Sequence, residues 1–264
     1  MLEIRNVSKT FNPGTVNEKI ALKGISLTLE DGDFVTVIGG NGAGKSTMLN
    51  AVAGVWPVDS GQIIIDGNDV TRLPEHRRAI YLGRVFQDPM TGTAATMGID
   101  ENLALARRRG QRRSFRSGIK HSEREEYHDL VATLGLGLED RMTSKVGLLS
   151  GGQRQAITLL MASLKKPKLL LLDEHTAALD PKTAAKVLES TESIIARDHL
   201  TTLMITHNMR DAIAHGNRLI MMSEGEIVLD IRGEEKSNLT VPDLLKKFEE
   251  ASGEEFANDQ AILG

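Results

Sequence analysis

The stretch from residue 34 to residue 54 restricts the possible fold of this chain more than any other. A short, largely β-branched run, FVTVI at 34–38, is typical of a strand buried on both faces of a mainly parallel sheet. A glycine-rich loop follows at 39–44, and residues 45–53 have the pattern of a helix that ends at Gly54. Loop and helix start together satisfy G-x-x-x-x-G-K-[ST], in the strand–loop–helix context where this pattern binds phosphate.

The chemistry of this loop predicts a nucleoside triphosphate as ligand. Glycines let the backbone curl so that successive N–H groups face one anion, and the helix N-terminus adds positive potential. Lys45 is expected to reach the outer phosphates, and the Ser46 hydroxyl group can ligate Mg²⁺. A plain glycine-rich turn is the alternative, which the flanking strand and helix disfavour. The residues expected to contact the ligand here are Gly39, Gly40, Asn41, Gly42, Ala43, Gly44, Lys45, Ser46 and Thr47.

A second apolar run, LLLL at 169–172, ends in two adjacent carboxylates, Asp173 and Glu174. Ligands of parallel sheets bind at the carboxyl ends of the strands. Neighbouring side chains of a strand point to opposite faces, so the two acids cannot share one task. We assign Asp173 to the Mg²⁺ shell and Glu174 to the orientation or deprotonation of water. Alone, the pattern fits a solvated strand end equally well, and the phosphate loop favours the functional interpretation.

The string LSGGQ at 149–153 is the most specific in the chain. Ser150 and the amides of Gly151 and Gly152 can cap a helix and also offer hydrogen-bond donors to an anion. A plain helix cap is the alternative. A second anion-binding helix start, in a chain with one complete phosphate loop, makes most sense if it serves the nucleotide of another copy of the chain.

The remaining pattern predicts an α/β fold with three parts: a mainly parallel sheet, an N-terminal antiparallel β subdomain and an inserted α-helical subdomain. Within the helical part, Ser122 and Glu125 are expected to form a capping box. A C-terminal amphipathic helix is expected over 241–256. Strands are further expected at 2–7, 22–29, 61–70, 80–86, 202–205 and 220–229, and helical segments between 98 and 149.

Composition excludes several classes of protein. With 264 residues, 40% of them hydrophobic and 26% charged, the chain is typical of a folded globular domain rather than a disordered one. No apolar stretch approaches the roughly 18 residues of a membrane span, and no secretion signal precedes the first strand, so we expect an intracellular chain. The absence of cysteine excludes disulfides, thiolate zinc sites and a cysteine nucleophile.

In their order along the chain, these motifs resemble those of the ATP-binding cassette (ABC) family, the ATPase subunits of ABC transporters. Residues 39–47 are similar to its Walker A motif, 149–153 to its signature motif and 169–174 to its Walker B motif with the catalytic glutamate; the resemblance covers roughly residues 1–232. Phe11 matches the aromatic residue that stacks on adenine, and Gln87 matches the glutamine that senses Mg²⁺ and the γ-phosphate. Residues 178–180, which end in Asp180, resemble the D-loop, and His207 resembles the switch histidine.

The resemblance implies a head-to-tail homodimer that closes on two ATP molecules with Mg²⁺. Each ATP lies between the phosphate loop of one copy and the signature motif of the other, with Ser150, Gly151, Gly152 and Gln153 as contacts. Catalysis is assigned to Glu174, His207, Lys45 and Gln87, and the metal to Ser46, Gln87 and Asp173. The ABC ATPase domain is expected over 1–232, with a helical subdomain at about 89–150 that contacts transmembrane permease subunits, and a C-terminal helical extension over 233–264.

This family placement implies an energy-coupling subunit on the cytoplasmic face of a bacterial membrane, in an importer of amino acids or similar small solutes that works indirectly with a substrate-binding protein. The segments 87–93 and 173–181 resemble a subgroup linked to tryptophan or tyrosine uptake. The chain differs from the residues most common in the family motifs at Gly40, His175, Ala177 and Asn208. None of these differences removes a catalytic group, but Ala177 replaces a serine at the contact between copies. A soluble cassette ATPase in cytosolic cofactor or complex assembly is the alternative function.

A basic cluster lies inside the expected helical subdomain, and two interpretations of it are open. It either faces anionic lipid headgroups beside the permease or is a solvated loop. Nucleic-acid binding is disfavoured, because only Phe115 interleaves the basic residues and stacking platforms need more aromatic side chains. The cluster consists of Arg107, Arg108, Arg109, Arg112, Arg113, Arg116 and Lys120.

Overall fold

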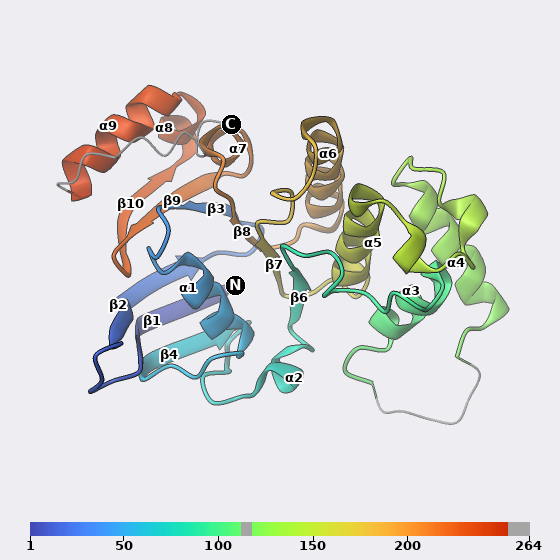
Figure 1. Ribbon diagram of the computed structural model, residues 1–264, viewed down its shortest axis with the longest axis horizontal. Coiled ribbons are helices and arrows are strands. Elements are labelled where there is room, and N and C mark those ends of the chain that lie inside the picture. The colour runs from blue at the N-terminus through green and yellow to red at the C-terminus, as the bar shows by residue number, and fades with distance from the viewer. Residues whose placement is uncertain (112–117, 253–264) are drawn as a thin grey trace.

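The computed structural model describes residues 1–111 and 118–252, which form two sheets with helices between and around them (Figure 1). A four-stranded antiparallel sheet has the order β2-β1-β4-β5, and a six-stranded sheet has the order β10-β9-β3-β8-β7-β6. Strands β3, β6, β7, β8 and β9 run parallel, and only β10 is antiparallel to its neighbour. The bounds are β1 Leu2–Phe11, β2 Lys19–Leu29, β3 Phe34–Ile38, β4 Ser60–Ile65, β5 Asn68–Asp69, β6 Leu82–Val85, β7 Leu169–Asp173, β8 Thr202–Ile205, β9 Arg218–Ser223 and β10 Glu226–Arg232.

Helix α1 (Lys45–Ala53) lies between the two sheets, where Met48, Leu49 and Val52 are buried against side chains of both (Figure 1). On the opposite face of the parallel sheet, α5 and α6 pack together and separate it from α3 and α4. The mixed sheet with an antiparallel subdomain and a helical insertion is therefore confirmed. The other helices are α2 Glu75–Arg78, α3 Ile99–Arg107, α4 His121–Ala132, α5 Gly151–Ser163, α6 Pro181–Asp198, α7 Met209–Ala214, α8 Gly233–Ser237 and α9 Val241–Ser252, with 3₁₀ turns at Glu139–Arg141 and Val146–Leu148.

The start of α4 differs from the prediction. The helix begins at His121, so the proposed capping box of Ser122 and Glu125 is wrong. The carboxylate of Glu123 instead accepts a hydrogen bond from the backbone N–H of Lys120 at 2.8 Å. The guanidinium group of Arg108, at the end of α3, also binds Glu123 at 3.1 Å, and this contact between helices favours the earlier start.

Three arginines of the basic cluster have partners within the protein. Arg107 pairs with Glu126 on α4, Arg108 pairs with Glu123, and Arg109 donates to the carbonyl oxygen of Ala162 on α5 at 3.4 Å. These three guanidinium groups join α3 to α4 and α5, and the two interpretations of the whole cluster stay predictions. Lys120 is exposed, and Arg112, Arg113, Phe115 and Arg116 lie outside the described residues.

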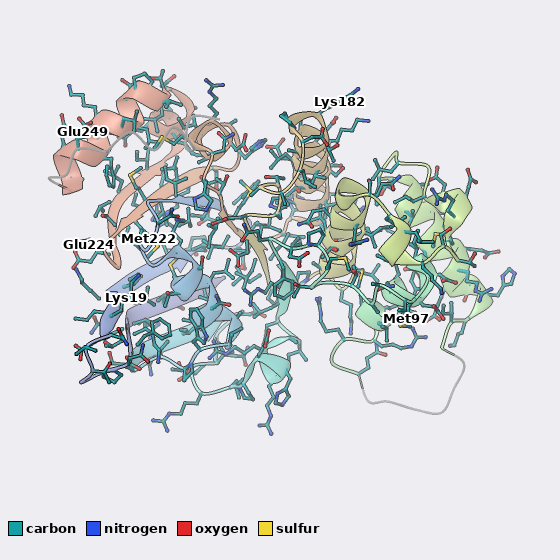
Figure 2. All side chains as sticks on the ribbon, in the orientation of Figure 1. Lys19, Met97, Lys182, Met222, Glu224 and Glu249 are labelled. Carbon is teal, nitrogen blue, oxygen red and sulfur yellow. The ribbon has the colours of Figure 1, made fainter. Side chains whose placement is uncertain are left out.

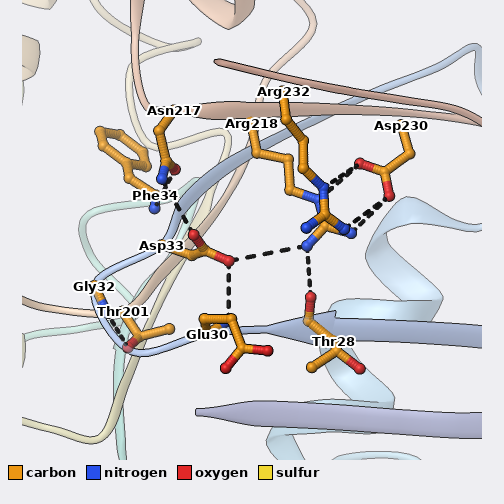
Figure 3. Close-up of polar contacts among 10 residues, drawn as sticks. All are labelled: Thr28, Glu30, Gly32, Asp33, Phe34, Thr201, Asn217, Arg218, Asp230 and Arg232. Carbon is orange, nitrogen blue, oxygen red and sulfur yellow. Dashed lines mark hydrogen bonds and ion pairs between the residues drawn. The ribbon is translucent and has the colours of Figure 1, made fainter.

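A buried arginine links the two sheets next to the segment that leads into β3 (Figure 3). The guanidinium group of Arg218 on β9 makes two 2.7 Å hydrogen bonds to Asp230 on β10 and one of 2.5 Å to the carbonyl oxygen of Thr28 on β2. The side chain of Asn217 accepts from the N–H of Phe34 at 2.9 Å and donates to Asp33 at 3.1 Å. These contacts fix the start of β3, the strand that carries the glycine-rich loop.

The C-terminal helix α9 packs its apolar face on the body of the protein. Leu244 and Phe248 are buried in a cluster with Met209 and Ala212 of α7. The expected helix is therefore present up to Ser252, and Phe256 lies outside the described residues. Within residues 1–111 and 118–252, no helix is long and apolar enough to span a membrane.

Candidate active site

The loop from Gly39 to Gly44 connects β3 to α1 and lies close to the backbone of its neighbours. A Cβ atom on Gly39, at φ 148°, would lie 2.1 Å from the carbonyl oxygen of Met222, and one on Gly44, at φ 101°, would lie 2.6 Å from that of Ala21. Only glycine fits these positions, because a side chain would be strained and would also clash. The first N–H groups of α1 have no partner within a helix, and they form the anion-binding end that the sequence predicts.

Lys45 is buried, and its ammonium group lies over the loop. Its Nζ atom donates to the carbonyl oxygens of Gly39 at 2.6 Å and Gly40 at 3.1 Å. Burial lowers the pKa of this lysine, while the nearby carboxylates of Glu174 and Asp173 oppose the shift. Hydrogen bonds to charged phosphate oxygens are stronger than those to neutral carbonyl oxygens, so phosphate would bind this ammonium group more tightly than the loop carbonyls do.

A cavity of about 300 Å³ is bounded by this loop, α1, Phe11, Glu174 and His207. The ring of Phe11 packs edge-on against Trp56, with 4.9 Å between the ring centroids, and this contact holds it at the cavity wall. Lys19 also lines the cavity, whereas the backbone of Met222 lies behind Gly39; both are labelled in Figure 2. The structure thus places the expected aromatic residue, the phosphate loop, the acid and the histidine around one space.

Glu174 and His207 follow the adjacent parallel strands β7 and β8 and meet at the strand ends. The Nε2 atom of His207 lies 2.6 Å from the Oε1 atom of Glu174. Glu174 is 9% exposed and has φ 46°, an uncommon conformation for a non-glycine residue and one found at functional sites. A carboxylate held in this way beside a cavity can accept a proton from water.

Asp173 is the last residue of β7 and lies next to a cation. The Nη2 atom of Arg84 on β6 is 3.4 Å from its Oδ2 atom. Burial raises the pKa of Asp173, and the Arg84 charge opposes this shift. Asp173 and Gln87, like Gly39 and Gly40, do not line this cavity; Gln87 follows β6 and is exposed.

Ser150 caps α5, as the sequence predicts. Its hydroxyl oxygen accepts from the N–H of Gln153 at 3.3 Å, and the Gln153 side chain accepts from the N–H of Ser150 at 3.1 Å. A Cβ atom on Gly152 would lie 2.0 Å from the methyl group of Thr183, so this glycine lets α5 approach α6. Asp180 caps α6 by accepting from the N–H of Thr183 at 3.1 Å.

The signature segment does not reach the cavity of its own chain. Ser150, Gly152 and Gln153 line a separate hollow of about 130 Å³ between α5 and α6. Within this chain the phosphate loop and the signature segment thus line different cavities.

His175, where the family commonly has proline, is fully buried and ties β7 to α6. The hydroxyl group of Thr191 donates to the carbonyl oxygen of Val187 at 2.7 Å, so its oxygen accepts from the Nε2–H group of His175 at 3.1 Å. Burial lowers the pKa of His175 from 6.5 to about 4, and the charge of His215 adds to the shift. His175 is therefore a neutral structural residue behind Glu174.

We expect this histidine to make the protein less stable in weak acid. Between pH 6.5 and 4 the unfolded chain binds the proton that buried His175 refuses, so stability falls as the pH drops through this window. His175→Gln keeps a hydrogen-bond donor to Thr191 but does not titrate. Between pH 7 and pH 4, its free energy of unfolding should therefore fall by about 3 kcal/mol less than that of the wild type. Urea unfolding at both pH values measures this. The exposed His121→Gln is the control, and an unchanged pH dependence in His175→Gln would contradict the assignment.

The sequence analysis missed Arg84, Asn50 and Lys19. Arg84 has a visible signal, a charged residue between Gly83 and Val85 inside a buried strand. Asn50 lies one turn after Ser46 on the same face of α1, and its side chain donates to the Ser46 carbonyl oxygen at 2.8 Å. Lys19 has no signal, because its place depends on how β2 packs beside the loop.

A phosphate loop on a parallel sheet, an acid and a histidine at neighbouring strand ends, an antiparallel β subdomain and a capped helix that starts with the signature motif define an ATPase of the ATP-binding cassette class. The chain belongs to the ABC transporter family, whose sequence profile matches residues 22–177. It binds nucleotide, hydrolyses ATP, dimerises and works with membrane permease subunits.

Three relatives illustrate the placement. The chain is 46% identical over 251 residues to the tyrosine transport ATP-binding protein of Clostridioides difficile (strain R20291), covering 95% of this chain and 100% of that protein. It is 36% identical over 241 residues to the ABC transporter ATP-binding protein YxdL of Bacillus subtilis (strain 168), covering 89% of each. The ATP-binding cassette MJ0796, solved as a dimer in a post-hydrolysis state with ADP and Pi, is 29% identical with a TM-score of 0.74, covering 88% of this chain and 98% of that one.

Proposed function

We propose that this chain is the energy-coupling ATPase of a bacterial importer that carries tyrosine or a similar aromatic amino acid. The observation that supports it most is the match along the whole length of a tyrosine transport ATP-binding protein. Lys45, Glu174 and His207 around one cavity support turnover rather than a purely regulatory role. The chain would act as a peripheral subunit on the cytoplasmic face, bound to the permease and served indirectly by a substrate-binding protein.

We further propose the division of the chain that the sequence suggested. Residues 1–232 form the ATPase domain, about 89–150 its helical subdomain and 233–264 a C-terminal extension. The helical subdomain would contact the permease, since α3 and α4 lie on the side of α5 away from the sheet (Figure 1). Closure of two ATPase domains around ATP would then move this subdomain together with the permease.

In the proposed mechanism, ATP binds between two copies. Phe11 stacks on the base, residues 39–47 bind the phosphates with Lys45 at their outer end, and residues 150–153 of the second copy cover the γ-phosphate, with Asp180 beside the contact between copies. Glu174 accepts a proton from the attacking water, while the Nε2–H group of His207, which contacts Glu174 in the absence of ATP, donates to the γ-phosphate once ATP is bound. Because the donors are fixed before reaction, catalysis is positioning plus electrostatics.

Mg²⁺ fits the residues assigned to it. Ser46, Gln87 and Asp173 offer a hydroxyl, an amide and a carboxylate oxygen, and magnesium at phosphate sites commonly uses one or two carboxylates together with the phosphates. When bound, the ion would neutralise charge on the β- and γ-phosphates. No group of three or more metal-binding His, Asp or Glu side chains occurs among the described residues.

Purification from membranes tests the transport function. We expect the tagged chain, extracted with mild detergent from cells that produce it at natural levels, to bring along a multi-span permease in equal amounts. Reconstituted with the co-encoded substrate-binding protein, this complex should hydrolyse ATP several-fold faster with tyrosine than with lysine. A soluble partner in place of the permease would favour the cofactor-assembly alternative, and a permease complex stimulated equally by both amino acids would contradict the cargo.

A further inference from the structure

Arg84 places a positive charge inside β6, a strand that is otherwise buried and apolar. Its side chain is 13% exposed, and β6 pairs in parallel with β7 so that Arg84 lies beside Leu171. Side chains alternate along a strand, so Asp173, two residues further on, shares the face of Leu171. Arginine in such a place requires partners that offset the loss of hydration.

The contacts of Arg84 converge on the proposed metal ligands. Its Nη2 atom lies 3.4 Å from the Oδ2 atom of Asp173 and donates to the Oδ1 atom of Asn50 at 2.8 Å. Asn50 in turn donates to the carbonyl oxygen of Ser46. The guanidinium carbon lies 4.5 Å from the ring centroid of Phe86, the residue before Gln87. One guanidinium group thus touches Asp173 itself and residues that hold or adjoin Ser46 and Gln87.

We propose that Arg84 is the resident counter-ion of Asp173: it occupies this carboxylate before the metal enters, and so sets the affinity of the site for the ion. Asp173 is half-buried, and a lone carboxylate there is unfavourable without a cation nearby. A divalent ion that approaches Asp173 must displace the guanidinium group or tolerate its charge. Asn50 and the Phe86 ring keep the group close by, ready to return when the metal leaves with the product.

This inference rests on the proposed metal ligands, and direct metal binding tests it. Mn²⁺, which substitutes for Mg²⁺ and has an electron paramagnetic resonance signal, is titrated into the full chain with adenylyl imidodiphosphate. We expect Arg84→Met to bind Mn²⁺ about tenfold more tightly than the wild type, because the loss of repulsion between two cations outweighs the loss of the hydrogen bonds to Asn50 and Asp173. Arg84→Lys, which keeps the charge, should stay within about threefold of the wild type.

Three comparisons make the result decisive. Arg77→Met, which changes an exposed arginine of α2, should not alter Mn²⁺ affinity. Nucleotide affinity in EDTA should be equal in wild type and Arg84→Met. Arg84→Gln is made in parallel, so that poor folding of one variant does not decide the outcome. Unchanged or weaker Mn²⁺ binding by folded neutral variants that still bind nucleotide would overturn the counter-ion role, whereas a wild type that binds no nucleotide at all would overturn the proposed function instead.

Discussion

Replacing Glu174 by glutamine is expected to slow ATP hydrolysis by about a thousandfold while leaving ATP binding intact. Glutamine has the shape of glutamate and can still hydrogen-bond His207, which lies 2.6 Å from the carboxylate, but it cannot take a proton from water. Phosphate release measures the rate, and a fluorescent ATP analogue measures binding. Since the ATP-bound state is no longer consumed, the variant should also accumulate as an ATP-dependent dimer in size-exclusion chromatography.

The matched control for this variant is Glu249→Gln, which makes the same change on the exposed side of α9. It should leave the rate within about twofold of the wild type, because surface substitutions remote from a site have small effects. A Glu174→Gln protein that hydrolysed ATP at the normal rate would contradict the assignment of the water-activating residue.

Two inactive variants, mixed, should restore part of the activity, because each composite site takes one half from each copy. Lys45→Met removes the cation over the phosphate loop and should by itself lower the rate at least about a hundredfold. Ser150→Asp keeps the cap of α5, since aspartate caps helices as well as serine does, but opposes the γ-phosphate with a negative charge. In a mixed dimer, one of the two sites then contains an intact Lys45 and an intact Ser150.

Random mixing of equal amounts should recover roughly a quarter of the wild-type rate, because half of the dimers are mixed and each has one good site of two. Lys45→Met mixed with Glu174→Gln is the control. Both changes lie on the same half of the site, so every site in that mixture is defective. No recovery in the first mixture, with normal folding of both variants, would show that the site is complete within one chain.

The parts of this protein that depend on neighbours in sequence were predictable. Strand, glycine loop and α1 follow one another directly, and the cap at Ser150 uses a residue three positions away. The place of Asp173 and Glu174 at the end of a buried strand follows from the apolar run that precedes them. The cavity that joins Phe11, Lys45, Glu174 and His207 needed the family resemblance, because these residues are far apart along the chain.

Contacts between remote segments were not predictable from local pattern. The start of α4 depends on Arg108, fifteen residues before Glu123, and a helix rule based on Ser122 has no access to that contact. Arginines 107–109 were grouped by their charge, whereas their acceptors lie on α4 and α5. Arg84 was missed for the same reason, since Asp173 is 89 residues away.

The distance of Ser150 from the cavity of its own chain has a consequence in the cell. In the proposed two-copy mechanism a lone copy has only half of each reaction centre, so its hydrolysis rate should rise with the square of its concentration. A permease that anchors two copies side by side raises their effective concentration to the millimolar range. Subunits that are not bound to a permease would therefore hydrolyse little ATP. Hydrolysis would occur mainly in assembled transporters, where it can drive transport.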